Sequence, residues 1–106
     1  NIESPGAAST DSPIDILTMD GPIGPAFATY LESGIARAQL DGAQAVIIEL
    51  NTPGGLLSTT REMITAIVES PVPVVIWVTP SGAHAASAGT FLMYAAHIAA
   101  MDEGTN

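Results

Sequence analysis

The sequence predicts an α/β domain built on a parallel sheet. Short β-branched runs alternate with longer segments of helical periodicity, which gives the order β-α-β-α-β-α. Two of the runs, 45–50 and 73–79, are apolar almost throughout, as is typical of strands covered on both faces. With 106 residues, the chain provides at most one small domain.

The first strand and helix are predicted within residues 14–42. Residues 14–19 form a short strand, which the sequence Asp20-Gly21-Pro22 interrupts. Pro25 suits the first turn of a helix, and Gly42 suits the left-handed residue that ends it. The apolar residues that share one face of this helix are Phe27, Tyr30, Leu31, Ile35 and Ala38.

The second strand, 45–50, leads into a helix that covers about 56–69. Ser70 ends this helix because the residue before a proline disfavours helical geometry. Its predicted buried stripe consists of Leu57, Ile64 and Val68, with Thr60 and Ile67 beside them.

The third strand, 73–79, leads into a helix over about 87–99. This helix is apolar nearly all round, which predicts that it lies in the core. A last short strand is expected around 98–102. Met63, Met93 and Trp77 are expected to fill the core.

The charge balance excludes several classes of partner. Eleven acidic residues against two arginines and no lysine give a net charge of −9, so the chain should repel nucleic acids and anionic membrane surfaces. The lack of cysteine excludes disulfides and thiolate metal sites. No apolar run approaches the roughly 20 residues that a membrane helix requires.

Residues 1–13 are rich in Ser, Pro, Ala, Gly and Thr and are predicted to be a flexible lead-in. The domain itself is expected over 14–106. Because the chain starts at Asn1 rather than methionine, we expect a processed or truncated piece of a longer protein.

Two loops are predicted to meet at one edge of the sheet. Asn51-Thr52-Pro53-Gly54-Gly55 and residues 80–87 each follow the carboxyl end of a strand, where sites of parallel α/β folds lie. Paired glycines let the backbone turn sharply and approach a ligand closely. A plain Gly-rich turn is the alternative; a phosphate loop would need the Lys-Ser/Thr that is missing here.

Ser87 stands at the predicted start of the third helix. Unpaired N–H groups and the positive end of the helix dipole favour negative charge there, which suits a serine nucleophile that generates an oxyanion. The Gly55 and Ala88 N–H groups could converge to form the oxyanion hole. The alternative is that Ser87 only caps the helix.

Together the two loops resemble those of the Clp-protease/crotonase superfamily. Residues 80–91, Pro-Ser-Gly-Ala-His-Ala-Ala-Ser-Ala-Gly-Thr-Phe, with Asp-Glu-Gly-Thr at 102–105, are similar to the NfeD group of membrane-bound serine proteases, partners of stomatin-type proteins. The resemblance spans roughly 14–106. It implies a Clp-protease/crotonase-like fold, present here as a partial domain, and a serine endopeptidase of the Ser–Lys type.

The resemblance also implies roles for individual residues. Ser87 matches the nucleophile, Gly55 and Ala88 match the oxyanion donors, and Gly54 shapes the substrate-binding loop. The implied substrate is a hydrophobic peptide segment, such as part of a stomatin-like protein, and no cofactor or metal is implied. A homodimer or larger homo-oligomer is expected, on the extracytoplasmic side, with membrane contact only through segments outside this chain.

The general base is missing from these 106 residues. The family's base is a lysine further downstream, and this sequence has none. His97, ten residues along the predicted helix and roughly 15 Å from its start, is too far from Ser87. His84 is close in sequence but is expected to be a solvent-facing loop residue.

Two other functions remain open. A crotonase-like acyl-CoA enzyme would use the same two N–H groups to hold a thioester enolate, although no basic residue near the loops would meet the CoA phosphates. A non-catalytic peptide-binding module of the same fold would need no base.

Overall fold

The computed structural model describes residues 13–80, 82–85 and 88–105, and it confirms the predicted α/β architecture. Four parallel strands form one sheet in the order β1-β2-β3-β4. The predicted lead-in, apart from Pro13, lies outside the described residues. The elements are β1 (Ile14–Asp20), α1 (Pro25–Asp41), β2 (Ala45–Asn51), α2 (Leu57–Val68), β3 (Val74–Val78), α3 (Ala88–Ala95) and β4 (Ile98–Met101).

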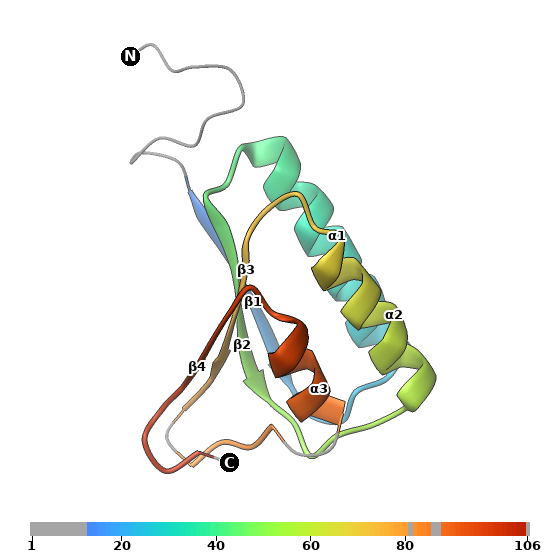
Figure 1. Cartoon of the computed structure of the whole chain (residues 1–106), viewed down its shortest axis with the longest axis vertical. Coiled ribbons are helices and arrows are strands. Elements are labelled where there is room, and N and C mark those ends of the chain that lie inside the picture. The colour runs from blue at the N-terminus through green and yellow to red at the C-terminus, as the bar shows by residue number, and fades with distance from the viewer. Residues whose placement is uncertain (1–12, 81, 86–87, 106) are drawn as a thin grey trace.

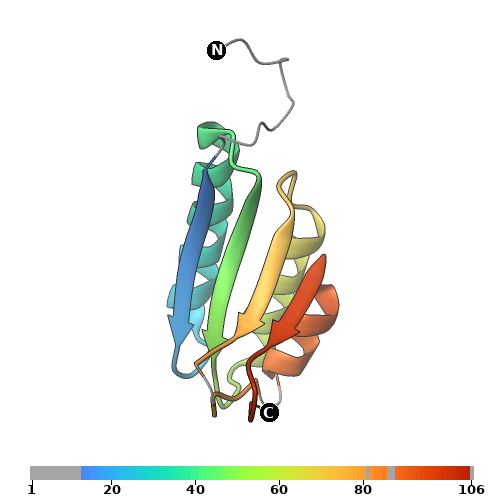
Figure 2. The same ribbon diagram turned by 90° about the vertical axis from the view of Figure 1, so that its left-hand side faces the viewer.

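Helices α1, α2 and α3 all lie on one face of the sheet, as Figures 1 and 2 show from two directions. The strands follow one another in chain order. Right-handed crossovers between such strands all pass over the same side, so the described helices gather there. The expectation that the apolar strands would be covered on both faces is therefore wrong for the described residues. Along β2, buried Val46, Ile48 and Leu50 alternate with half-buried side chains on the bare face.

The core lies between the sheet and the helices. Its largest fully buried side chains are Met19, Ile23, Leu31, Ile48, Leu50, Met63, Ile67, Ile76 and Leu92, together with Val46, Val74 and Val78. Met63 fills the core as expected, but Trp77 does not. The indole lies on the bare face, 36% exposed, and its Nε1–H donates to Asp102 Oδ1 at 2.6 Å.

Helix α1 has the predicted bounds, and Gly42 ends it in the left-handed conformation with φ of 67°. Its buried residues include the expected Leu31, Ile35 and Ala38. Tyr30 was assigned to this face and is instead 42% exposed. Its hydroxyl accepts the Thr18 N–H at 3.1 Å, at the edge of the sheet where no other described strand pairs with β1.

Helix α2 buries a different stripe from the predicted one. Leu57 and Val68 are 58% and 62% exposed, and the buried residues are Thr59, Thr60, Met63 and Ile67. A threonine can lie in the core here because the Thr60 hydroxyl donates to the Leu56 carbonyl at 2.8 Å.

Helix α3 is shorter than predicted and ends at Ala95. His97 therefore lies beyond the helix, where its N–H donates to the Val74 carbonyl and its Nδ1 accepts the Val74 N–H. These bonds start the pairing of β4 with β3, so residues 98–101 are a strand rather than the end of a helix. Leu92 of α3 is buried, in agreement with a core position.

Burial on α1 gives a matched pair of substitutions. Leu31 is fully buried and Leu40, on the same helix, is 85% exposed. We expect Leu31→Ala to lower the free energy of unfolding by about 2–5 kcal/mol through lost burial and a cavity. Leu40→Ala should change it by no more than about 0.5 kcal/mol. Urea denaturation measures both, and equal losses would contradict the packing of α1.

Candidate active site

The loops that follow β2 and β3 lie side by side at the carboxyl edge of the sheet, as predicted. Thr52 pairs with Ala85 in an isolated parallel bridge, which continues the β2–β3 pairing beyond the strand ends. The Thr52 N–H donates to the His84 carbonyl at 2.7 Å. The His84 N–H in turn donates to Asn51 Oδ1 at 2.9 Å.

The Thr52 side chain is buried and holds the start of the double-glycine turn. Its Oγ1 accepts the Gly54 N–H at 3.1 Å and donates to the Gly54 carbonyl at 3.3 Å. Gly54 has a backbone φ of 113°, which residues other than glycine rarely adopt. The turn therefore depends on a glycine at this position and on a hydroxyl two residues before it.

Gly55 is needed for a different reason, which is the close approach of another backbone. A Cβ at this position would lie 2.1 Å from the Ile23 carbonyl oxygen. Ile23 donates to the Gly54 carbonyl at 2.9 Å and accepts the Leu56 N–H at 3.1 Å. In a parallel pair of this kind, the N–H of the residue opposite points to the other side. Ile23 bonds the residues on either side of Gly55, so the N–H of Gly55, an exposed residue, takes no part in this pairing.

The first turn of α3 packs directly on the loop that follows β2. A Cβ at buried Gly89 would lie 2.8 Å from Thr52 Cγ2 and 3.4 Å from the Ala85 Cβ. Ala88 is the first residue of α3. Ser87, the predicted nucleophile, lies outside the described residues, so its side chain is not part of this geometry.

The two histidines lie in different places. His84 belongs to the loop before α3, is exposed, and bonds through its backbone to the loop that follows β2. His97 lies at the opposite end of β3, where its ring accepts the Val74 N–H. The predicted place of His97 on the helix was wrong, because α3 ends at Ala95. Its separation from Ser87 stays a prediction, since Ser87 lies outside the described residues.

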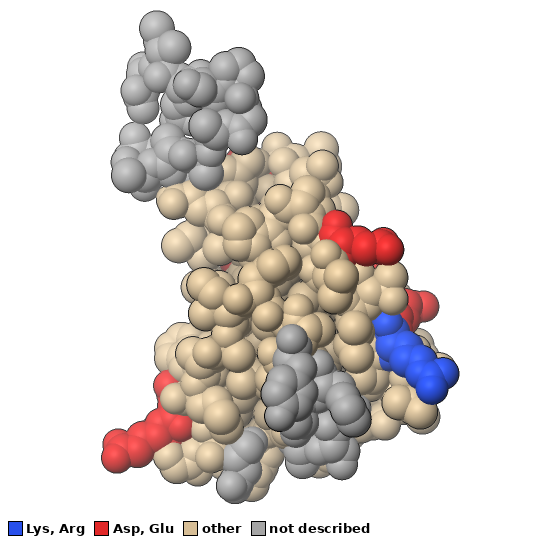
Figure 3. All heavy atoms as spheres, in the orientation of Figure 1, with Lys and Arg blue, Asp and Glu red and all other residues tan. Residues whose placement is uncertain are grey.

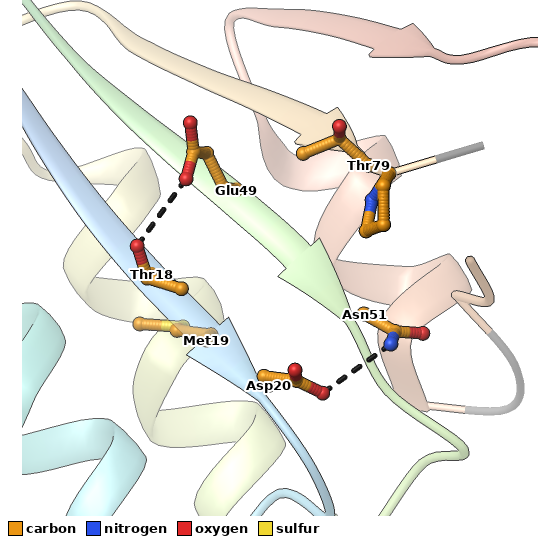
Figure 4. Close-up of a pocket in the computed structure, with 7 residues that line it drawn as sticks. Thr18, Met19, Asp20, Glu49, Asn51 and Thr79 are labelled. Atoms are coloured by element: carbon orange, nitrogen blue, oxygen red, sulfur yellow. Dashed lines mark hydrogen bonds between the residues drawn. The ribbon is translucent and has the colours of Figure 1, made fainter.

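A hollow of about 230 Å³ opens on the bare face at the same carboxyl edge (Figure 4). Across it, Thr18 Oγ1 donates to Glu49 at 3.3 Å and Asn51 Nδ2 donates to Asp20 at 3.3 Å.

Asn51 has a structural role that the sequence analysis did not predict. The amide joins the end of β1 to the loop before α3, because its Oδ1 accepts the His84 N–H. The residues that line the hollow are Thr18, Met19, Asp20, Glu49, Asn51, Thr79 and Pro80.

Charge is sparse on the face shown in Figure 3, where acidic side chains lie toward the rim and a basic one at the right-hand edge. Among the described residues, no three His, Asp or Glu side chains are grouped as metal ligands. No helix in the described ranges has the length and hydropathy of a membrane span.

Comparison with known proteins adds three findings. The family model of the NfeD1b N-terminal domain matches residues 14–106. The membrane-bound protease PH1510 of Pyrococcus horikoshii is 46% identical over 72 residues, which are 68% of this chain and 16% of that protein. A lysine-to-alanine variant of the 1510-N membrane-bound stomatin-specific protease, in complex with a substrate peptide, superposes with a TM-score of 0.87 at 36% identity, covering 92% of this chain and 44% of the other.

A more distant structure shows the fold alone. A ClpP1 variant from Listeria monocytogenes has a TM-score of 0.69 at 20% identity and covers 76% of this chain and 46% of its own. The chain therefore has a ClpP-like fold. It spans less than half of these two solved chains and about a sixth of the Pyrococcus relative.

The approach of Ile23 to Gly55 predicts the effect of a single methyl group. Gly55→Ala should separate the two backbones, because the added Cβ overlaps the Ile23 carbonyl. We expect faster amide hydrogen exchange at Ile23 and Leu56, the donors of that pairing. Gly24→Ala is the matched control, since a Cβ there meets nothing within 4 Å. Unchanged exchange in Gly55→Ala would contradict the close approach.

Proposed function

Because the chain belongs to the NfeD1b N-terminal domain family, we propose that it is part of a ClpP-like serine endopeptidase domain. The observation that carries the proposal is the meeting of the two loops through Thr52 and Ala85. It brings a turn with the exposed Gly55 to the edge at which α3 begins. An acyl-transfer site needs such N–H groups close to its nucleophile.

The proposed reaction begins with Ser87. Its Oγ attacks the scissile carbonyl, the hydroxyl proton passes to a general base, and the tetrahedral oxyanion accepts hydrogen bonds from the Gly55 and Ala88 N–H groups. The C–N bond then breaks and the leaving amine takes the proton. Water hydrolyses the resulting ester, which regenerates the serine.

Support for the two donors comes from the backbone. The first N–H groups of a helix have no partner within it, and Ala88 is the first residue of α3. The Gly55 N–H takes no part in the pairing with Ile23, which uses Gly54 and Leu56, and Gly55 is exposed. Both groups are therefore suited to a ligand oxygen at this edge.

The proposed base is a lysine outside the 106 residues, because the sequence holds none. One solved relative is a lysine-to-alanine variant in complex with a substrate peptide, so that protein has a lysine whose replacement was combined with peptide binding. The same absence favours the second candidate, a module that binds peptides without cleaving them. Ser87-dependent cleavage separates the two functions.

The proposed substrate is a hydrophobic segment of a stomatin-like protein. One relative is named stomatin-specific, and Leu56 and Leu57, next to the glycine turn, are more than half exposed. We further propose that the domain acts as a homo-oligomer on the extracytoplasmic side of a membrane, to which other segments attach it. Its relative PH1510 is named membrane-bound.

An acyl-CoA enzyme has less support. The chain has two basic side chains to meet phosphates, and one of them, Arg37, already lies 3.5 Å from Asp41. Saturable binding of an acyl-CoA in a calorimeter would favour this function over the protease.

The nucleophile is tested by Ser87→Ala in the complete protein. We expect the cleavage rate of a hydrophobic peptide to fall by about 10³-fold or more, since the attacking atom is removed. Ser58→Ala, which removes an exposed hydroxyl near the start of α2, should leave the rate unchanged. Undiminished cleavage by the Ser87 variant would refute the assignment.

The second donor is tested by Ala88→Pro. Proline lacks an N–H but is tolerated in the first turn of a helix, so the donor is lost while α3 persists. We expect kcat to fall by about 10²–10³-fold, the usual cost of one oxyanion donor. Ala88→Gly keeps the N–H and should retain most of the rate. A proline variant with full activity would exclude this donor.

A further inference from the structure

We propose that Thr52 is a positioning residue. It holds the turn with Gly55 and the start of α3 with Ala88, which carry the two proposed oxyanion donors, at a fixed separation. Its consequence for catalysis rests on the function proposed above. Thr52 contacts both segments through its hydroxyl, its methyl group and its backbone. The sequence analysis assigned it no role beyond membership of the turn. Each contact fixes a different segment.

The hydroxyl fixes the glycine turn. It accepts the Gly54 N–H at 3.1 Å and donates to the Gly54 carbonyl at 3.3 Å, and both residues are buried. Without the hydroxyl, the Gly54 N–H would be buried and unpaired, which costs enough to make the turn rearrange. Gly55, the next residue, carries the proposed donor, so its N–H would move with the turn.

The methyl group fixes the start of α3. Gly89 lies so close to Thr52 Cγ2 that a Cβ on the glycine would be at 2.8 Å. Closely packed groups of this kind transmit displacement, because a core has little free space to absorb it. The Thr52 methyl thus limits how near the first turn of α3, with the Ala88 N–H, can come to the glycine turn.

The backbone of Thr52 fixes the register between the loops. Its N–H donates to the His84 carbonyl at 2.7 Å, within the parallel bridge to Ala85. The side chain is fully buried, so it has no freedom to adopt another rotamer toward solvent. One residue therefore sets turn geometry, helix distance and register together.

Two substitutions separate the parts of this side chain. Thr52→Val keeps the methyl contact and removes the hydroxyl, while Thr52→Ser keeps the hydroxyl and removes the methyl. In the complete protein we expect Thr52→Val to lower kcat for a hydrophobic peptide by about 10²-fold with KM within about twofold, since donor misplacement affects the transition state most. Thr52→Ser should recover at least about tenfold of that loss, because Gly54 keeps its partner.

The matched control is Thr60→Val. Thr60 is also fully buried and donates its hydroxyl to a carbonyl, that of Leu56, which retains the Thr60 N–H as a donor. This variant should keep kcat within about twofold. Thermal unfolding of both valine variants separates a general loss of stability from a loss of position. If Thr52→Val keeps the wild-type kcat, or loses no more than Thr60→Val, the proposal is wrong.

Amide hydrogen exchange gives a readout that does not need catalysis. Thr52→Val should speed exchange at Gly54 by at least about tenfold, while Thr60→Val should not. If Ser87→Ala reveals no Ser87-dependent cleavage, the protease function fails but exchange still decides the role of Thr52. Equal exchange at Gly54 in the two valine variants would then overturn the positioning role.

Discussion

The site depends on the continuation of parallel pairing past the ends of β2 and β3. Where the strands stop, the Thr52–Ala85 bridge keeps the two following loops in register. The loop after β2 also pairs with Ile23, so it is held on both sides by neighbouring backbones. Loops are usually the mobile parts of a fold. Here backbone pairing gives them the geometry of a small extra sheet, and the fixed geometry suits the oxyanion site that we propose.

The two glycines illustrate how different physical demands produce one short motif. Gly54 is required by its backbone conformation, whereas Gly55 is required by the space that Ile23 occupies. A third glycine, Gly89, allows α3 to approach Thr52. The glycines in the sequence could therefore indicate where the site lies. The physical reason for each glycine became clear only from the structure, which shows the backbone conformation and the neighbouring segments.

The order of the elements and their approximate bounds were predictable from the sequence, because periodicity and turn residues are local properties. The meeting of the loops was predictable because both follow the carboxyl ends of parallel strands. It failed where the answer depends on other segments. Composition could not reveal that sequential strand order puts the described helices on one face, which leaves Trp77 exposed. The buried stripe of α2 was misplaced, since Leu57 and Val68 are exposed and the side facing the sheet includes Met63. Ser87 remains a prediction, since it lies outside the described residues.

The contact between Tyr30 and Thr18 bears on how such a sheet avoids growing. An open strand edge is a template on which a second molecule can add a strand, the first step toward fibrous aggregates. The phenol from α1 occupies a donor midway along β1, so an incoming strand would have to displace it to complete its ladder. Helix α1, which covers part of the core, therefore also hinders the addition of another strand to β1 at this position.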